Sequence, residues 1–549
     1  MAFVSALLTS LIAVALFPLY ALVSRLSRQR SLWYVPGPAS VSLLSGILSV
    51  WFGEDALAFQ ERTTKQHGRI VSLTGFLGDK ILYIADTKAL YEIFVKNTDD
   101  FEVHEGLRES TRLVFGGIGL FSANGDVHRR QRKLMNPAFS INHMRRMMPT
   151  FQATTQQLVA HLSEGVGKET VEIDIMDYTS RLALELIAQA GLGHSFGAIE
   201  GKDDGYGNVL NRFETTLGKL TMFGSLLPVL TRLIPGQVLR SLAEILPWPT
   251  LHEMLNISDT MQETSREIWK EKKRLFALGD KSVVNEYGEG KDIMMNANLA
   301  AEEDDRLADH ELLAQINTFT LAAADTTSSA LARILYLLAL HPDVQERLRE
   351  ELTEACDAKG EIGHDHLVDL PLLEAVCRET LRLYPPVSCV FRQCVNDCML
   401  PLAHPYTDTH GFEHNELFVP GGGTMVIVNI VGVNRDKATW GPDAEEWRPE
   451  RWLSPLPDSV TEARVPGVYA NLLTFIGGGH ACIGFKFAQL EMKVALSRLV
   501  PSFRFAPSER EIVWRFGGAV TPSVKGSTSN EAELPLLISP VMQMVENRS

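Results

Sequence analysis

The sequence predicts a mainly α protein of the α+β type, with small peripheral β-sheets and an N-terminal transmembrane helix. Three observations support this prediction: helical periodicity through residues 127–384, short strand-like runs at 69–85 and 387–433, and an uncharged, mostly apolar stretch at 2–23. The 549 residues are 45% hydrophobic and 22% charged, as in globular proteins. That length allows three or four domains, or one large helical unit.

The stretch at 2–23 is long enough to cross a bilayer as a helix, at about 1.5 Å per residue. Arg25, Arg28 and Arg30 follow it directly, so the positive-inside rule places the N-terminus outside and the rest of the chain in the cytosol. A cleaved signal peptide is the alternative, but the start is uncharged and no clear small-residue cleavage site precedes the arginines. We therefore expect an anchor at 2–23 and a basic, Pro-Gly-containing hinge at 24–40.

The body of the chain begins with two short strands in 69–85, separated by a turn at 77–79. Residues 317–341 form a long apolar helix that begins near Asp309 and ends before Pro342. This helix is apolar all round and lacks flanking arginines, so we expect it in the core and not in a membrane.

The C-terminal part contains a helix at 367–383, which Pro385 stops, and then the strand-like runs of 387–433. A final long helix is expected at 485–500, and the tip of a hairpin at 516–518.

Charge and cysteine content restrict the possible functions. The net charge of −15 argues against nucleic acid as a partner. Six cysteines are few for a disulfide scaffold of this size, and they favour a reducing compartment. The spacing of Cys389, Cys394 and Cys398 is close to that of an iron–sulfur site, but their strand and turn setting favours a structural role.

The strongest chemical signal is a cysteine in a glycine-rich loop, at 475–484, directly before the last long helix. Glycines allow close approach of the backbone to a flat group and leave amide hydrogens free to point at the sulfur of Cys482. A helix N-terminus and nearby amides stabilise a thiolate, which is a ligand for iron. A buried, unreactive cysteine is the alternative interpretation.

This loop resembles the haem-binding signature of the cytochrome P-450 superfamily, which Phe475, Gly478, Cys482 and Gly484 match. The resemblance implies haem as cofactor, with Cys482 as the axial thiolate ligand of the iron. It also implies a helical haem domain with small peripheral sheets, so that 41–549 is one catalytic domain. The family usually has arginine two residues before the cysteine, where it contacts a haem propionate, and this sequence has His480.

Further motifs occur in the family's order. Glu379 and Arg382 match its E-x-x-R helix, and Arg451 lies in a Pro-Glu-Arg-Trp run that resembles its Pro-Glu-Arg-Phe. The resemblance implies that these three residues form a buried structural network. Asp325 and Thr326 match the Asp-Thr pair of the family's central helix, which implies that Thr326 stabilises the activated oxygen and Asp325 relays protons. A threonine that bends the helix by bonding back to a carbonyl is compatible with that role.

Other residues correspond to the family's propionate contacts. Arg132 occupies the arginine position of a Trp-x-x-x-Arg helix, His128 takes the tryptophan position, and Arg392 matches a third contact. Arg129, Arg130 and Lys133 add a local basic patch. This patch is either a solvated helix face or a docking site for an acidic reductase.

The resemblance implies a monooxygenase that takes dioxygen and electrons from an NADPH-cytochrome reductase. With the anchor, it implies a single-pass protein of the endoplasmic reticulum membrane. Residues 217–249 are rich in Leu, Ile and Pro and resemble the family's lid, which faces the membrane; an ordinary core helix is the alternative. The substrate pocket is expected to be lined by a loop at 103–121, by Phe319 and Ala322, and by 387–390 and Phe516.

The sequence resembles fungal members of the family, many of which oxidise terpenoids. We therefore expect hydroxylation of a lipophilic terpenoid in secondary metabolism. The alternatives are a fatty-acid or xenobiotic hydroxylase, a haem-thiolate isomerase or dehydratase that needs neither dioxygen nor reductase, and a non-catalytic, membrane-tethered helical protein.

Overall fold

The computed structural model describes residues 23–42, 44–202, 205–224, 226–277, 298, 306–357, 360–527, 529 and 531–541. The predicted membrane anchor at 2–23 therefore falls outside the described residues except for its last position. Within the described ranges, no helix combines the length and the apolar character that a membrane span needs.

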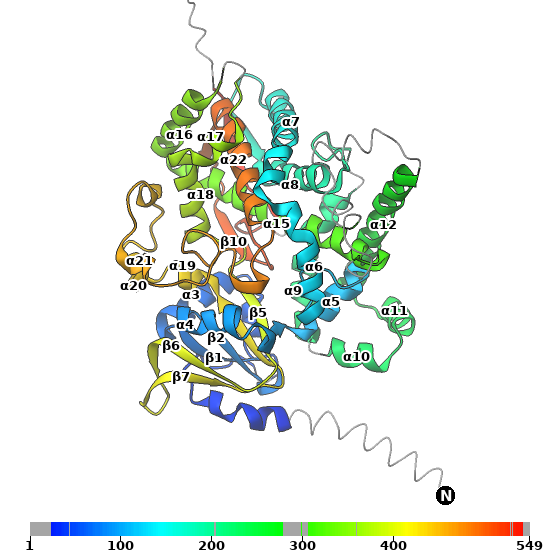
Figure 1. Ribbon diagram of the computed structural model, residues 1–549, viewed down its shortest axis with the longest axis vertical. Coiled ribbons are helices and arrows are strands. Elements are labelled where there is room, and N and C mark those ends of the chain that lie inside the picture. Colours follow the sequence, from blue (N-terminus) through cyan, green and yellow to red (C-terminus); the bar gives the residue numbers. More distant parts are fainter. Residues whose placement is uncertain are drawn as a thin grey trace, which may run out of the picture.

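Helices form most of the described chain, and most of the long ones lie toward one end of the molecule (Figure 1). The longer helices are α3 (Ala56–His67), α5 (Glu105–Phe115), α6 (Gly125–Met135), α7 (Ile141–Val166), α8 (Ile175–Leu186), α9 (Tyr206–Gly224), α11 (Gly236–Ile245), α12 (Pro249–Ala277), α15 (Asp309–Leu340), α16 (Pro342–Ala355), α18 (Pro371–Leu383) and α22 (Phe485–Ser502). The shorter helices are α2 (Leu48–Trp51), α4 (Thr87–Tyr91), α10 (Leu227–Leu233), α17 (His364–Asp369), α19 (Ile430–Asn434), α20 (Lys437–Trp440) and α21 (Asp458–Thr461). Helical turns used below are η3 (Glu92–Lys96), η5 (Asn136–Phe139), η8 (Pro449–Trp452) and η9 (Gly478–His480).

The largest sheet lies at the opposite end of the molecule and has the strand order β1-β2-β8-β5-β3 (Figure 1). Its strands are β1 (Ile70–Thr74), β2 (Lys80–Ile84), β3 (Phe101–Val103), β5 (Cys389–Cys394) and β8 (Thr424–Asn429). Strands β1 and β2 pair antiparallel with Ile70 opposite Ile84, which confirms the hairpin predicted in 69–85. Strand β8 runs parallel to β2, so the sheet joins segments far apart in the sequence.

Three smaller sheets complete the β structure. The pair β6 (Cys398–Thr407) and β7 (Glu413–Val419) lies beside the large sheet, and β10 (Ile512–Phe516) and β11 (Val520–Val524) form the predicted C-terminal hairpin. The third sheet has the order β4-β12-β9, with β4 (Val171–Asp174), β12 (Pro535–Pro540) and β9 (Phe503–Pro507). The prediction of a mostly helical protein with small sheets is confirmed.

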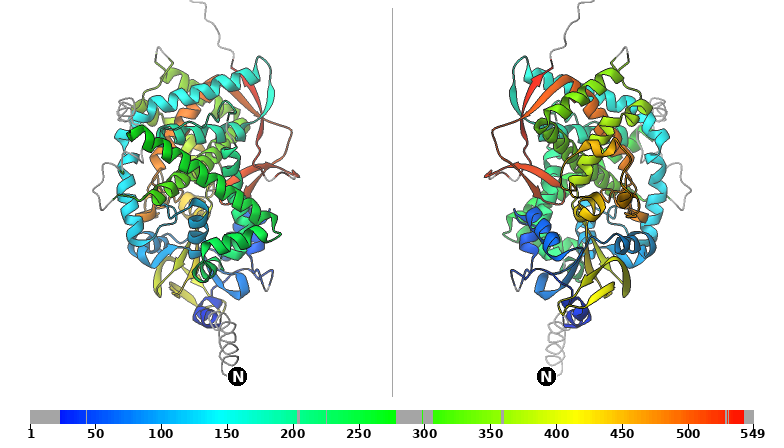
Figure 2. Two further views of the ribbon diagram at one scale, coloured as in Figure 1. Left: turned by 90° about the vertical axis from the view of Figure 1, so that its right-hand side faces the viewer. Right: turned by 90° about the vertical axis from the view of Figure 1, so that its left-hand side faces the viewer.

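Helix α15 is the centre of the helical body. It is buried along most of its 32 residues and contacts α8, α12, α18 and α22. Its start is capped by Glu311, whose carboxylate accepts a hydrogen bond from the Ala308 amide at 3.1 Å. It ends before Pro342, which is the first residue of α16. The predicted core helix is therefore confirmed, while α10, α11 and α12 cover one side of the molecule (Figures 1 and 2).

Two expectations about secondary structure were wrong. The single helix predicted at 367–383 is two helices, α17 and α18, because Pro371 begins a new helix and holds Leu370 in an extended conformation. The loop expected at 103–121 contains the helix α5, whose buried face includes Thr111 and Val114.

Candidate active site

The cysteine loop holds its sulfur by backbone hydrogen bonds. Cys482 lies between η9 and the start of α22, and its amide donates to the carbonyl oxygen of Phe475 at 2.9 Å. The amide of Gly484 points at the Cys482 sulfur and acts to lower the pKa of the thiol. The loop therefore offers the sulfur a hydrogen-bond donor, as the glycine-rich sequence predicted.

Gly478 is required by a close backbone contact. Its φ is +67°, and a Cβ atom at this position would lie 1.7 Å from the carbonyl oxygen of Phe94 in η3. Gly477 is similarly confined, because a Cβ atom there would lie 1.9 Å from the Pro466 carbonyl oxygen. These two glycines thus allow the loop to pack against backbone, whereas the sequence had suggested approach to a flat ligand.

A Gly478→Ala variant is expected to accumulate as misfolded protein or as protein that fails to bind haem, because the added methyl group overlaps the Phe94 carbonyl. Gly484→Ala is the matched control, since φ is −88° and the nearest atom to its Cβ would be Phe139 Cε1 at 3.8 Å. We expect the control to keep at least half of the wild-type haem content. Haem per polypeptide, measured by absorption, checks both results, and equal haem binding by the two variants would contradict the steric argument.

Cys482 and Ala322 are both accessible among buried neighbours. The cysteine is exposed to solvent by surface area, yet burial among protein atoms raises the pKa of its thiol. On α15, Ala322 is likewise exposed although Leu321 and Ala324 beside it are buried.

Aromatic contacts connect α15 to the cysteine loop. Phe319 of α15 packs on Phe139 of η5 with ring centroids 5.7 Å apart. The Phe139 ring lies beside the cysteine loop, 3.8 Å from where a Cβ atom at Gly484 would be. Phe475, at the start of the loop, packs on Phe485 of α22 with centroids 6.2 Å apart.

Four side chains that can donate hydrogen bonds, two histidines and two arginines, lie beside the cysteine loop. The rings of His128 (α6) and His480 (η9) stack with centroids 3.8 Å apart. Arg132 donates a short hydrogen bond to the Ala481 carbonyl oxygen. Arg392 of β5 donates to the neighbouring carbonyl of Phe391 at 2.9 Å, and burial lowers the pKa of its guanidinium to about 10.

Burial is the largest influence on the pKa values of the two histidines, and the two arginines act on both of them. The pKa of His128 is lowered to about 4, mainly by burial and further by the charges of Arg132 and Arg392. The pKa of His480 is lowered to about 3, mainly by burial and further by Arg392, His128 and Arg132. Within the described ranges, no carboxylate pairs with these four side chains. The cluster therefore fits the two propionates of a haem whose iron binds Cys482.

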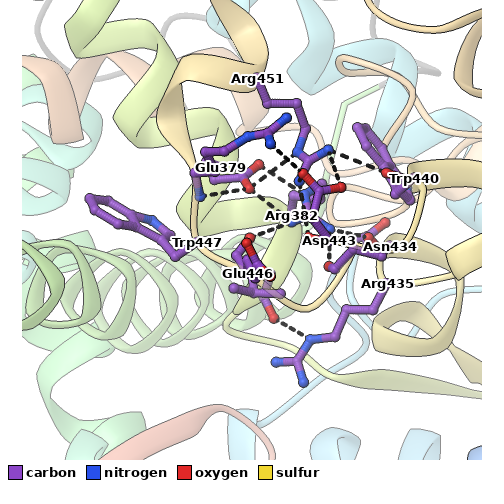
Figure 3. Close-up of polar contacts among 12 residues, drawn as sticks. Glu379, Arg382, Asn434, Arg435, Trp440, Asp443, Glu446, Trp447 and Arg451 are labelled. Atoms are coloured by element: carbon purple, nitrogen blue, oxygen red, sulfur yellow. Dashed lines mark hydrogen bonds and ion pairs between the residues drawn. The ribbon is translucent and has the colours of Figure 1, made fainter.

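The predicted Glu–Arg–Arg network is present, and it joins α18 to η8 (Figure 3). Glu379 and Arg382 are fully buried, and two guanidinium nitrogens of Arg382 donate to the two Glu379 oxygens, each at 2.8 Å. Arg451 of η8 donates to Glu379 Oε1 at 3.4 Å and pairs with Asp443 at 3.1 Å. The other Arg382 donors bond backbone carbonyls between α19 and η8, so the network ties α18 to that segment.

Asp325 and Thr326 lie within the continuous helix α15. The Thr326 hydroxyl donates to the Ala322 carbonyl oxygen at 2.7 Å, the back-bond that the sequence allowed. Asp325 is buried, and burial followed by Glu214 raises the pKa of its carboxyl group well above the usual range. Glu214 was not predicted, because a single acid in a helix of mixed polarity carries no motif.

The basic patch on α6 is partly neutralised. Arg129 pairs with Asp99 and Asp126 at 2.8 and 2.7 Å, and Arg130 makes a short ion pair with Glu311 at the start of α15. Arg129 and Arg130, which were expected to attract a reductase, thus have carboxylate partners within the chain.

The central helix, the cysteine loop before α22 and the cluster of two arginines and two histidines beside it fit a thiolate-ligated haem enzyme. The chain belongs to the cytochrome P450 family, whose model matches residues 36–528. It is similar to cytochrome P450 monooxygenases 91 and 81 of Postia placenta, with 45% and 44% identity over 92% and 96% of this chain and 94% and 96% of the relatives. It is also 41% identical to a ganoderic acid synthetase of Ganoderma lucidum, over 90% of this chain and 92% of that protein.

Family membership establishes the class of reaction. The protein is a cytochrome P450 monooxygenase, an oxidoreductase with haem iron on a cysteine thiolate. Members of the family generally use dioxygen, a lipophilic substrate and a reductase partner. An isomerase without oxygen chemistry is not the reaction that the relatives' names describe.

Proposed function

We propose that this enzyme hydroxylates a lipophilic terpenoid, with electrons from an NADPH-cytochrome reductase and with its N-terminus anchored in the endoplasmic reticulum membrane. The terpenoid assignment rests on the similarity to a ganoderic acid synthetase over nearly the whole chain. The hydrophobic stretch at 2–23 and the three arginines that follow it support the anchor and the cytosolic catalytic domain.

An exposed apolar surface on α10 and α11 supports a substrate that arrives from a lipid phase. Leu233 and Ile245 are 76% and 78% exposed, and none of the residues of α11 is buried. This exposure does not support the core-helix alternative for α11, whereas Leu217 and Leu220 of α9 are partly buried against the core. A large exposed apolar patch marks an interaction site. Further exposed apolar residues of the segment are Leu226, Val229, Leu230, Val238, Leu242 and Leu246.

Different residues are assigned to haem binding and to proton transfer. The bound haem supplies the oxidising chemistry. Cys482 holds the iron, while His128, Arg132, Arg392 and His480 orient the propionate edge. Thr326 and Asp325 hold protons on α15, one turn after the exposed Ala322.

The full-length enzyme, reconstituted with a fungal reductase and NADPH, is expected to convert at least one member of a panel of sesqui-, di- and triterpenoids into a product heavier by one oxygen atom. Mass spectrometry with ¹⁸O₂ checks the source of that atom. Turnover of fatty acids alone would contradict the terpenoid assignment, and products formed without NADPH would contradict the monooxygenase cycle. Denatured enzyme with active reductase is the control.

A further inference from the structure

A carboxyl group that belongs to no sequence motif lies between three elements near Thr326. Glu214 of α9 accepts a short hydrogen bond from the backbone amide of Ala519, at the tip of the β10–β11 hairpin. A Cβ atom at Gly518 would lie 2.7 Å from the carboxyl carbon of Glu214, and φ at this glycine is +135°. The hairpin tip is therefore shaped around this carboxyl group.

No cation balances Glu214 in the part of the chain that the structure describes, where the Ala519 amide is its one hydrogen-bond donor. Its carboxyl group lies against the hairpin backbone at Gly518 and Ala519. Burial raises the pKa of the Glu214 carboxyl group. The side chain nevertheless remains partly accessible, so its second oxygen, Oε1, can receive a hydrogen bond.

Asp325 provides an independent indication that a ligand binds here. It is only 8% exposed, and among the described residues its carboxylate has no hydrogen-bond partner. Glu214 is the charged group that acts on it. A buried carboxyl group that lies near a second, partly accessible one, neither with a counter-ion among the described residues, is costly to the fold. A hydrogen-bond donor at Glu214 would offset part of that cost. The hairpin is also tied to α15, because Ser329, one turn after Asp325, donates a short hydrogen bond to the Val520 carbonyl oxygen beside Ala519. Such a donor would therefore bind beside the helix that carries Thr326.

Resting on the proposed function, we propose that Glu214 anchors the substrate by accepting a hydrogen bond from a hydroxyl group on an otherwise lipophilic scaffold. Glu214 is thus a specificity-determining residue, and the substrate is a terpenoid alcohol and not a hydrocarbon. An earlier reaction that introduces oxygen, by hydration or oxidation, must supply it. A protonated amine is a donor of the same chemistry, and the experiment separates the two.

The test is a spectral titration of the ferric, haem-loaded, full-length enzyme with paired ligands. The probes are farnesol and lanosterol, each with its methyl ether, then N,N-dimethylfarnesylamine, and a non-terpenoid pair of dodecanol and its methyl ether. Wild type should bind at least one alcohol about 10- to 100-fold more tightly than the matching ether, the range for a hydrogen bond to a charged group. Glu214→Leu should bring that ratio within about twofold and leave the ether's affinity unchanged.

Two further variants keep the result interpretable. Glu214→Gln keeps an acceptor oxygen for the ligand and should retain part of the preference for the alcohol. If the leucine variant fails to bind haem, the ratio of alcohol to ether affinity in Glu214→Gln alone tests the proposal. Glu200→Gln is the matched control, because Glu200 is 57% exposed and pairs with Lys202 on the surface. It should leave every affinity unchanged.

An alcohol preference that survives in Glu214→Leu, or that is absent from every pair in wild type, would overturn the proposal. Tighter binding of the amine than of farnesol, lost in Glu214→Gln, would support anchoring by Glu214 but replace the hydroxyl by an ammonium group. A preference seen only with dodecanol would keep the anchor and refute the terpenoid substrate.

Discussion

A Cys482→Ser variant is expected to lose monooxygenase activity to background and to lose the absorption band that the thiolate-ligated, ferrous carbon monoxide complex gives. The serine hydroxyl is a far weaker acid than a thiol, so it does not replace the thiolate that pushes electron density toward the iron. The Arg132, Arg392 and histidine cluster remains, and haem retained by this cluster would show a shifted spectrum. The carbon monoxide difference spectrum and haem content of the purified variant check this result.

Cys356→Ser is the matched control for the cysteine change. The Cys356 thiol is half-buried at the end of α16 and donates to the Leu352 carbonyl oxygen at 3.2 Å, a bond that serine can also make. This variant should keep the wild-type spectrum and turnover. Retention of both by Cys482→Ser would show that another group binds the iron.

The sequence predicted those parts of the site that depend on contiguous residues. The cysteine loop and its helix occupy a short stretch in which glycine positions and the cysteine spacing carry the information. Helix α15 was predictable because its apolar run is long and Pro342 ends it. The split at Pro371 was missed because the periodicity continues across α17 and α18, although proline at a first helical position signals such a boundary.

Contacts between segments far apart in the chain could not be predicted from the sequence. The stacking of His128 on His480 joins α6 to the cysteine loop, and nothing in the local sequence of either histidine indicates this contact. The ion pair of Arg130 with Glu311 likewise removed a charge that looked free for a partner. Glu214 meets Ala519 only because the C-terminal hairpin folds back on α9. Each of these features depends on tertiary packing, which local propensity does not encode.

A Glu379→Gln variant is expected to yield little folded, haem-loaded protein. The change leaves Arg382 and Arg451 buried without their shared carboxylate, and breaking a buried pair in this way typically costs about 3–5 kcal/mol. That cost is a large part of the roughly 5–15 kcal/mol by which a protein domain is stable. Because α18 packs against α15 and α22, the loss extends to the helix that follows Cys482. The thermal midpoint and the yield of haem-loaded protein check this prediction.

Arg448→Ala tests whether burial, and not merely an ion pair, is responsible. The Arg448 side chain is 52% exposed and pairs with Asp443 at 2.7 Å, while its contribution to Glu379 comes from the backbone amide, which alanine retains. An exposed pair of this kind contributes about 0–1 kcal/mol, so the variant should resemble wild type. If both variants lost stability equally, the buried geometry around Glu379 would not explain the effect. If neither did, the network would not be what holds α18 to the segment beyond α19.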